Sequence, residues 1–197
     1  MNPDTRVAVC CYAGDAHQVT EMLDLYKHHE CPVTVLSPMD SKADVPGVDN
    51  LYGGKRAYIG QACLDRQVEH FKLLLSHYPE KHFLLHDSDS ICISPKLPAC
   101  LYAEPDVLWS NLVYNDIKEQ QRGFPRGIPH LAFQPPWFLS RRTIERILET
   151  GRPIENTILP FIDYWLVETA ARNRIPYKPL PQAVSIGLSS NNPTAAP

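Results

Sequence analysis

Apolar residues follow two different periods along the first half of the chain. Short, nearly continuous apolar runs predict buried strands, and apolar residues spaced three or four apart predict helices between them. Pro32 and Pro79 stand where these helices should end. The expected elements of this half are strand 6–12, helix 16–29, strand 33–36, helix 58–77 and strand 81–86. This alternation indicates parallel strands joined by right-handed crossovers.

The second half of the chain has a less regular pattern. Residues 131–139 are apolar but contain Pro135 and Pro136, so we do not expect a regular central strand there. Residues 115–129 are polar and contain glycines, which predicts a loop. Ser140 could cap a following helix. The other expected elements are strands 91–93, 106–110 and 184–188 and helices 140–150 and 161–173.

Together these elements predict a single Rossmann-like α/β domain over residues 1–188, with a central, mostly parallel mixed sheet flanked by helices. The 197 residues suffice for one compact core. Hydrophobic residues make up 44% of the chain and charged residues 21%, which is typical of a globular protein. Residues 189–197 are expected to be a tail or the start of a linker, so the chain could be one domain of a larger protein.

Charge and cysteine content narrow the expected partners and compartment. The net charge is −3 and the pI is near 6.2, so no overall basic field favours nucleic acid as a partner. The six cysteines form no Cys-x-x-Cys pair, which is typical of reduced and mostly buried thiols. We find no secretion signal and no apolar run of membrane-spanning length. We therefore expect a cytoplasmic protein.

The run from Phe83 to Ser90 is the strongest candidate for chemistry. Here an apolar strand ends in Asp87, Ser88 and Asp89, and residues two apart in a strand project to the same face. The two carboxylates could therefore hold one divalent cation, because Mg²⁺ and Mn²⁺ prefer oxygen ligands, often together with substrate phosphates. The alternative is a turn whose side chains bind backbone amides. The position at the end of a strand in an α/β sheet favours a binding site.

With the first strand (7–12) and the segment 160–166, this motif resembles the GT-A class of glycosyltransferases, which use nucleotide-sugars and carry Asp-x-Asp after a central strand. The resemblance implies a GT-A fold and a metal-dependent, hexosyltransferase-like enzyme. Such an enzyme moves a sugar from a nucleotide-diphosphate donor, with UDP-sugars favoured, to a carbohydrate or other hydroxyl acceptor. Asp89 would be the main ligand of Mn²⁺ or Mg²⁺, and Asp87 would contact the ribose or the metal through water. The cation would stabilise the departing nucleoside diphosphate.

The resemblance also implies where the donor binds. The turn after the first strand and the end of the second strand would hold the nucleotide, and the next loop and helix would contact the diphosphate and the donor sugar. Each of these residues could instead be an ordinary turn residue or an exposed charge. The candidates are Cys11, Tyr12, Ala13, Gly14, Asp40, Lys55, Arg56, Asp65, Arg66, Asp87 and Ser88.

Acceptor-side candidates lie later in the chain. Asp163 begins an apolar helix and is the best candidate for the catalytic base of an inverting enzyme. In a retaining enzyme it would orient the acceptor, and simple helix capping is the alternative. Trp137 and Tyr164 could stack on a sugar ring, although burial in the core would explain either residue.

One feature departs from the GT-A pattern. Many such transferases take a third metal ligand, often a histidine, from near the C-terminus. The last histidine here is His130, and the tail offers only Ser189, Ser190, Asn191 and Asn192. Either the acidic pair, water and the diphosphate hold the metal, or the ligand belongs to a longer chain.

Two other functions compete with glycosyl transfer. In a haloacid-dehalogenase-like phosphatase, Asp87 would be the nucleophile and Asp89 the acid/base, but that motif usually lies near the N-terminus. A non-enzymatic sugar-binding module would use Trp137 and Tyr164 as platforms. An EF-hand calcium loop is excluded, because Pro98 stands at the position that requires glutamate.

Overall fold

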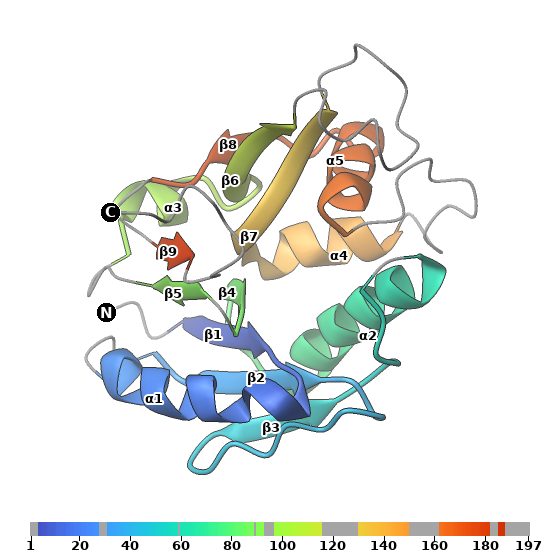
Figure 1. Ribbon diagram of the computed structural model, residues 1–197. Coiled ribbons are helices and arrows are strands. Elements are labelled where there is room, and N and C mark those ends of the chain that lie inside the picture. The colour runs from blue at the N-terminus through green and yellow to red at the C-terminus, as the bar shows by residue number, and fades with distance from the viewer. Residues whose placement is uncertain are drawn as a thin grey trace.

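A mixed β-sheet forms the centre of the protein (Figure 1). The computed structural model describes residues 4–27, 31–58, 60–88, 90–92, 97–115, 130–149, 162–181 and 185–187. The sheet contains β1 (Thr5–Cys10), β2 (Val33–Ser37), β3 (Asp49–Tyr52), β4 (His82–Asp87), β6 (Leu108–Asn115), β7 (His130–Ser140) and β8 (Tyr177–Pro179). Its order is β3-β2-β1-β4-β7-β6-β8, and β5 (Ser90–Cys92) pairs separately with β9 (Ser185–Gly187).

Strand direction brings three chain segments to one edge of the sheet. β1, β2, β3 and β4 are parallel, β7 is antiparallel to both β4 and β6, and β8 is parallel to β6. The expected single α/β domain with a mostly parallel mixed sheet is therefore confirmed. Parallel pairing places the carboxyl ends of β1, β2 and β4, at Cys10, Ser37 and Asp87, along the same edge.

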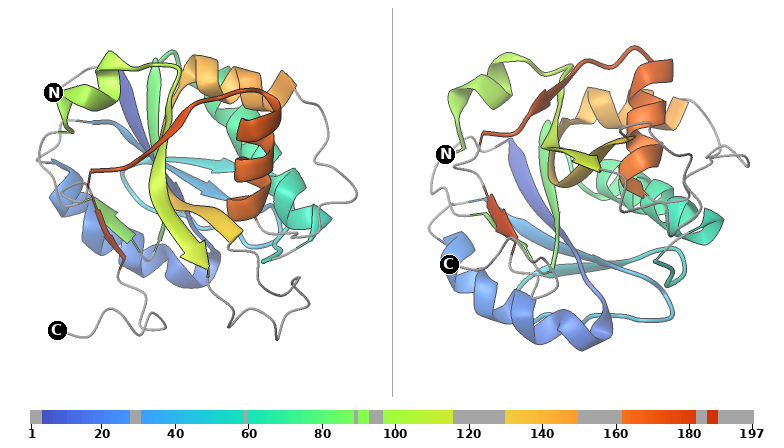
Figure 2. Two further views of the ribbon diagram at one scale, coloured as in Figure 1. Left: turned by 90° about the horizontal axis from the view of Figure 1, so that it is seen from above. Right: turned by 45° about the horizontal axis from the view of Figure 1, so that its top comes forward.

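Helices cover both faces of this sheet, as Figures 1 and 2 show. α1 (Ala16–Lys27), which follows the short 3-10 helix η1 (Ala13–Asp15), shares one core with α3 (Ala99–Ala103). α2 (Gln61–His77), α4 (Arg141–Glu149) and α5 (Ile162–Arg172) contribute to the core on the opposite face. Side chains alternate along β1, so Val7 and Val9 enter the first core and Ala8 enters the second.

The expected helix ends differ little from those in the structure. α2 begins at Gln61, three residues later than expected, after Gly60 at a φ of 82°, a conformation that favours glycine. Ser140 caps α4 as expected, because its Oγ accepts the N–H of Thr143 at 3.0 Å. These caps place both helices against the sheet at fixed points.

The expectation for residues 131–139 was wrong, because β7 lies between β4 and β6 in the sheet. The pairing of β6 with β7 shifts register between Ser110 and Asn111, so Pro135-Pro136 falls where the ladder is interrupted. Ser110 Oγ donates to the carbonyl of Gln134 (2.8 Å), and Asn111 Nδ2 donates to that of Pro135 (3.0 Å). These side-chain bonds hold β7 to β6 where the ladder cannot.

Other parts of the pattern were also misjudged. β3 lies between the expected strand 33–36 and the expected helix 58–77, where no strand was predicted, and β6 extends to Asn115 rather than ending at Ser110. Neither α3 nor β8 was expected. The expected loop after Asn115 and the boundary between the domain and its tail fall outside the described residues.

Two further observations concern the cysteines and the lengths of the helices. Cys10, Cys11, Cys63 and Cys100 are free thiols, and Cys11, Cys31 and Cys63 are buried. None of the helices within the described ranges is long and apolar enough to cross a membrane.

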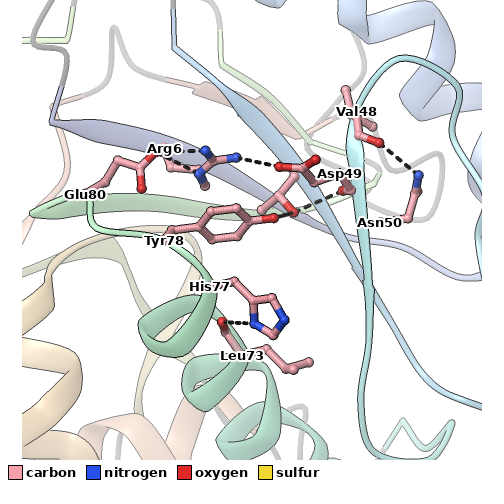
Figure 3. Close-up of polar contacts among 9 residues, drawn as sticks. Arg6, Val48, Asp49, Asn50, Leu73, His77, Tyr78 and Glu80 are labelled. Atoms are coloured by element: carbon pink, nitrogen blue, oxygen red, sulfur yellow. Dashed lines mark hydrogen bonds and ion pairs between the residues drawn. The ribbon is translucent and has the colours of Figure 1, made fainter.

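A buried arginine ties the amino ends of the strands together (Figure 3). Arg6 of β1 forms ion pairs with Glu80 at 2.8 Å and with Asp49 of β3 at 3.4 Å. Its guanidinium also lies 3.6 Å from the centroid of the Tyr78 ring. Tyr78 in turn shares a hydrogen bond of 2.9 Å with Thr34 of β2. The cluster connects β1, β2, β3 and the segment before β4 at the end of the sheet opposite Asp87.

We predict that Arg6→Ala lowers the free energy of unfolding by about 3–5 kcal/mol, because it leaves the buried Glu80 carboxylate without its cation. Urea denaturation measures the change. Lys81→Ala is the control, because the Lys81–Asp4 pair is exposed and should contribute less than about 1 kcal/mol. Equal losses in the two variants would contradict the prediction.

Candidate active site

A cleft of about 440 Å³ lies at the carboxyl edge of the sheet. Its walls come from the ends of β1, β2 and β4, from the first turns of α1 and α5, and from α2 and β7. Open α/β sheets bind their ligands at this edge, and the volume is within the usual range for small-molecule sites. The cleft is therefore the candidate active site.

Asp87 stands at the centre of this edge. It is the last residue of β4, is exposed and borders the cleft. The next residue, Ser88, is buried, also borders the cleft, and donates its N–H to the Cys10 carbonyl at 3.0 Å. Asp89, the expected main metal ligand, lies outside the described residues.

Two further carboxylates, those of Asp15 and Asp163, border the same cleft. Asp163 lies in the first turn of α5, and Asp15 ends η1. Burial is the main cause that raises the pKa of the Cys63 thiol, and the charges of Asp163 and Asp87 add to it. Asp163 and Asp87 both border the cleft, so α5 and β4 bring the two residues to the same space.

Arg66 supplies a buried positive charge to the cleft. Its Nη1 donates to the Ala57 carbonyl at 2.6 Å and to the Tyr12 hydroxyl, and its Nη2 lies 3.5 Å from Cys63 Sγ. Within the described part of the chain it forms no ion pair with a carboxylate. A guanidinium without a carboxylate partner is suited to bind an anionic group of a ligand.

Sequence reasoning missed the rest of the polar face of α2. Cys63, Gln67 and His70 border the cleft with Arg66, and all four are buried. The amide nitrogen of Gln67 is buried and has no hydrogen-bond partner among the described residues. Polar residues at spacings of three, four and seven on a helix with an apolar face were the signal that could have revealed them.

Protonation states limit what these side chains can do. Burial, followed by the charge of Asp87, raises the pKa of Cys10 to about 12, and burial with Asp15 raises that of Cys11 to about 12. Both thiols therefore stay protonated at neutral pH and are poor nucleophiles. Burial, with a smaller effect of Arg66, lowers the pKa of His70 to about 3, so this imidazole is neutral.

Two aromatic rings border one side of the cleft, and a cation outside the lining lies against them. The rings of Tyr12 and Tyr58 lie 5.4 Å apart, and the Arg56 guanidinium is 5.1 Å from the first centroid and 5.5 Å from the second. Tyr58, which the sequence analysis did not single out, is 65% exposed and borders the cleft. The exposed ring of Tyr58 is suited to stack on a planar ligand group, with the half-buried ring of Tyr12 beside it.

The structure brings together only some of the predicted site residues. Asp40 and Asp65 lie outside the cleft lining: Asp40 accepts the Arg56 N–H at 2.7 Å, and Asp65 accepts from Gln61 at 2.8 Å. Ala13, Gly14, Lys55, Arg56 and Tyr164 also lie outside it. The predicted residues that border the cleft are Cys11, Tyr12, Arg66, Asp87, Ser88, Trp137 and Asp163.

Trp137 has a mainly structural position. It is 4% exposed, and its Nε1 donates to the Phe133 carbonyl at 2.7 Å. Tyr164 is likewise buried. Neither residue presents an open platform for stacking on a sugar.

Among the described residues, Asp87 is the candidate ligand for a divalent cation. No group of three His, Cys, Asp or Glu side chains in the described ranges is placed to hold a metal ion. Asp87 offers an exposed carboxylate, and Mg²⁺ or Mn²⁺ is commonly bound by one or two carboxylates with waters and substrate phosphates. The site therefore suits a metal that arrives with a phosphorylated ligand.

Comparison with solved structures shows the fold. The chain is similar to 4-diphosphocytidyl-2C-methyl-D-erythritol synthase, with a TM-score of 0.54 and 14% identity over 98% of this chain and 95% of that chain. It is also similar to a structure assigned as a glucose-1-phosphate thymidylyltransferase from Bacillus anthracis in complex with sucrose, with a TM-score of 0.47 and 11% identity over 90% and 86% of the two chains. No family model and no curated protein matches the sequence. Function must therefore be argued from the site.

We predict that His70 makes stability fall on acidification. Its folded-state pKa of about 3 lies below the ordinary value of 6.5, so the unfolded chain alone takes up a proton below pH 6.5. The free energy of unfolding should then fall by about 1.4 kcal/mol per pH unit from this group, or about 2 kcal/mol by pH 5. Above pH 6.5 this contribution to stability is fully present.

Urea denaturation of the wild type and His70→Gln at pH 7 and pH 5 measures the effect. The variant should lose less stability between the two pH values, by about 2 kcal/mol. A variant that loses as much as the wild type would show that His70 is protonated in the folded protein.

Proposed function

We propose that the protein is a metal-dependent glycosyltransferase that moves a sugar from a nucleotide-diphosphate donor, with UDP-sugars favoured, to a hydroxyl acceptor such as a carbohydrate. One observation carries this proposal: Asp87, Arg66 and Asp163 converge on a single cleft at the carboxyl edge of the sheet. The position of Asp87 after a central parallel strand and the Rossmann-like fold support a nucleotide site there.

Charge balance in the cleft supports a diphosphate bound together with a cation. Asp15, Asp87 and Asp163 face one guanidinium, that of Arg66, among the described lining residues. A diphosphate alone would add negative charge to an already negative site. Asp87 and Asp89 would hold Mn²⁺ or Mg²⁺, which when bound neutralises the charge of the departing nucleoside diphosphate.

The remaining residues have complementary roles in this proposal. Tyr12 and Tyr58 would contact the nucleoside at the mouth of the cleft, where their rings border it. Arg66 and Gln67 would contact the transferred sugar or the diphosphate, because one carries a charge and the other an unsatisfied amide N–H. These contacts would orient the anomeric carbon.

Asp163 would activate the acceptor from the α5 side of the cleft. As the acceptor oxygen attacks the anomeric carbon, its proton passes to Asp163, and the sugar–phosphate bond breaks with its electron pair on the diphosphate. This step inverts the anomeric centre. In a retaining enzyme the same carboxylate would orient the acceptor.

A nucleotidyltransferase is the second candidate, because the fold is similar to that of a synthase of a diphosphocytidyl compound. Its substrate would be a nucleoside triphosphate, and a single arginine facing three carboxylates suits a diphosphate better. The products separate the candidates. Release of nucleoside diphosphate indicates glycosyl transfer, release of pyrophosphate indicates nucleotidyl transfer, and release of phosphate from simple monoesters indicates a phosphatase.

We predict that UDP and UDP-sugars raise the thermal stability of the protein only when Mn²⁺ is present. A ligand at one hundred times its dissociation constant should add about 2.7 kcal/mol to the free energy of unfolding. Asp87→Asn and Asp89→Asn should abolish this increase, because each removes a carboxylate from the proposed metal site. Asp44→Asn, at an exposed position outside the cleft, is the control. Stabilisation that persists in Asp87→Asn and Asp89→Asn would rule out the proposed site.

We predict that Asp163→Asn slows Mn²⁺-dependent release of UDP from a UDP-sugar donor by about 10²- to 10⁴-fold, the usual contribution of a general base. Donor binding should change little, because the diphosphate lies near Asp87. Glu168→Gln, on the same helix but outside the cleft, should keep the wild-type rate. A rate within a few-fold of wild type in Asp163→Asn would exclude its role as the base.

A further inference from the structure

The peptide group between Asp87 and Ser88 is held from both sides. Its N–H, that of Ser88, donates to the Cys10 carbonyl at 3.0 Å. Its carbonyl, that of Asp87, lies 2.9 Å from Nδ1 of the preceding residue, His86. This peptide directly follows Asp87, the first aspartate of the Asp-Ser-Asp motif, so its orientation constrains the backbone at Asp87.

Sheet pairing alone does not fix the backbone at this point. The pairing of β4 with β7 ends at Leu85, and the pairing with β1 ends at Asp87. His86 therefore stands where one side of β4 has already left the sheet. A side chain that bonds the next carbonyl can replace the missing strand contact.

Strand alternation explains why His86 can serve in this way. Leu84 and His86 point toward α1, whereas Leu85 and Asp87 point toward α2 and the cleft. His86 is 2% exposed, and its Nε2 lies 2.5 Å from the hydroxyl of Tyr26 on α1. The imidazole thus lies on the α1 face of the sheet, outside the cleft lining.

These two bonds select one tautomer of the ring. A carbonyl oxygen can only accept, so Nδ1 of His86 must carry a proton to bind it. In the neutral ring Nε2 is then an acceptor, and the Tyr26 hydroxyl must donate to it. A buried relay therefore runs from Tyr26 through His86 to the carbonyl of Asp87.

We propose that His86 is a positioning residue for Asp87, the first aspartate of the Asp87-Ser88-Asp89 motif, and that Tyr26 holds it in the Nδ1–H tautomer. This inference rests on the proposed function, in which that motif binds Mn²⁺ with a nucleoside diphosphate. Groups that orient metal ligands usually contribute 10- to 100-fold to metal affinity. His86 was not among the candidate site residues, because it lies outside the cleft.

Tyr26→Phe tests the relay, because it removes the hydroxyl that donates to Nε2 and keeps the ring. Loss of that donor removes the preference for the Nδ1–H tautomer, and in the other tautomer Nδ1 has no proton for the Asp87 carbonyl. Tyr78→Phe is the matched control. It also removes one hydroxyl hydrogen bond of a buried tyrosine, at the opposite end of the sheet (Figure 3).

Two readouts separate positioning from a loss of stability. Mn²⁺ affinity in the presence of UDP, followed by electron paramagnetic resonance, should fall by about 10- to 100-fold in Tyr26→Phe and stay near wild type in Tyr78→Phe. Long-range ¹H–¹⁵N correlation spectra should show a protonated Nδ1 and an unprotonated Nε2 for His86 in the wild type. That signature should be lost or mixed in Tyr26→Phe.

The outcomes distinguish the two proposals. If the wild type binds no Mn²⁺ with UDP, the proposed function fails. If it binds Mn²⁺ but Tyr26→Phe binds equally well, or both tyrosine variants lose affinity alike, the positioning role is wrong. A wild-type spectrum with the proton on Nε2 overturns it without any variant, so the test stands even if Tyr26→Phe does not fold.

Discussion

The parallel pairing of β1 with β4 is the contact on which the rest of the structure depends. Six register pairs, from Thr5↔His82 to Cys10↔Asp87, join segments that are far apart in the sequence. They bring the turn after β1 beside Asp87 and bury apolar side chains on both faces of the sheet. Arg6 fixes the amino end of this pair, and the Ser88–Cys10 bond extends it at the carboxyl end. The position of the candidate site and the packing of the core therefore both depend on the pairing of β1 with β4.

The polar face of α2 is buried against this edge at an energetic cost. Arg66 and Gln67 would be better solvated in water, and a buried amide without a partner costs about 1–3 kcal/mol. Phe71 and Leu74 on the same helix offset that cost by filling the core. Ligand binding explains why α2 keeps these buried polar groups beside the cleft better than packing does, because packing alone would favour apolar side chains there.

The sequence predicted those features that depend on local pattern. The strand ending in Asp87 was predicted because its apolar run is continuous, and α4 because Ser140 is a good cap. The local sequence pattern was insufficient where pairing between distant strands decides the structure. β7 accommodates Pro135-Pro136 because its register with β6 shifts there. Tyr58, in the segment before α2, became a site candidate only through the position of that segment in the fold, whereas the polar spacing on α2 could have pointed to Gln67.

If the cleft binds a metal and a nucleoside diphosphate as proposed, its charges imply that the two bind cooperatively. Without a ligand, Asp87 is an exposed carboxylate, and the described ranges contain no complete metal cage. A metal bound there alone would keep most of its waters, so its affinity should be low. A diphosphate alone would face three carboxylates and one guanidinium. Each ligand removes the unfavourable charge that the other meets, and by linkage each must raise the affinity of the other by the same factor.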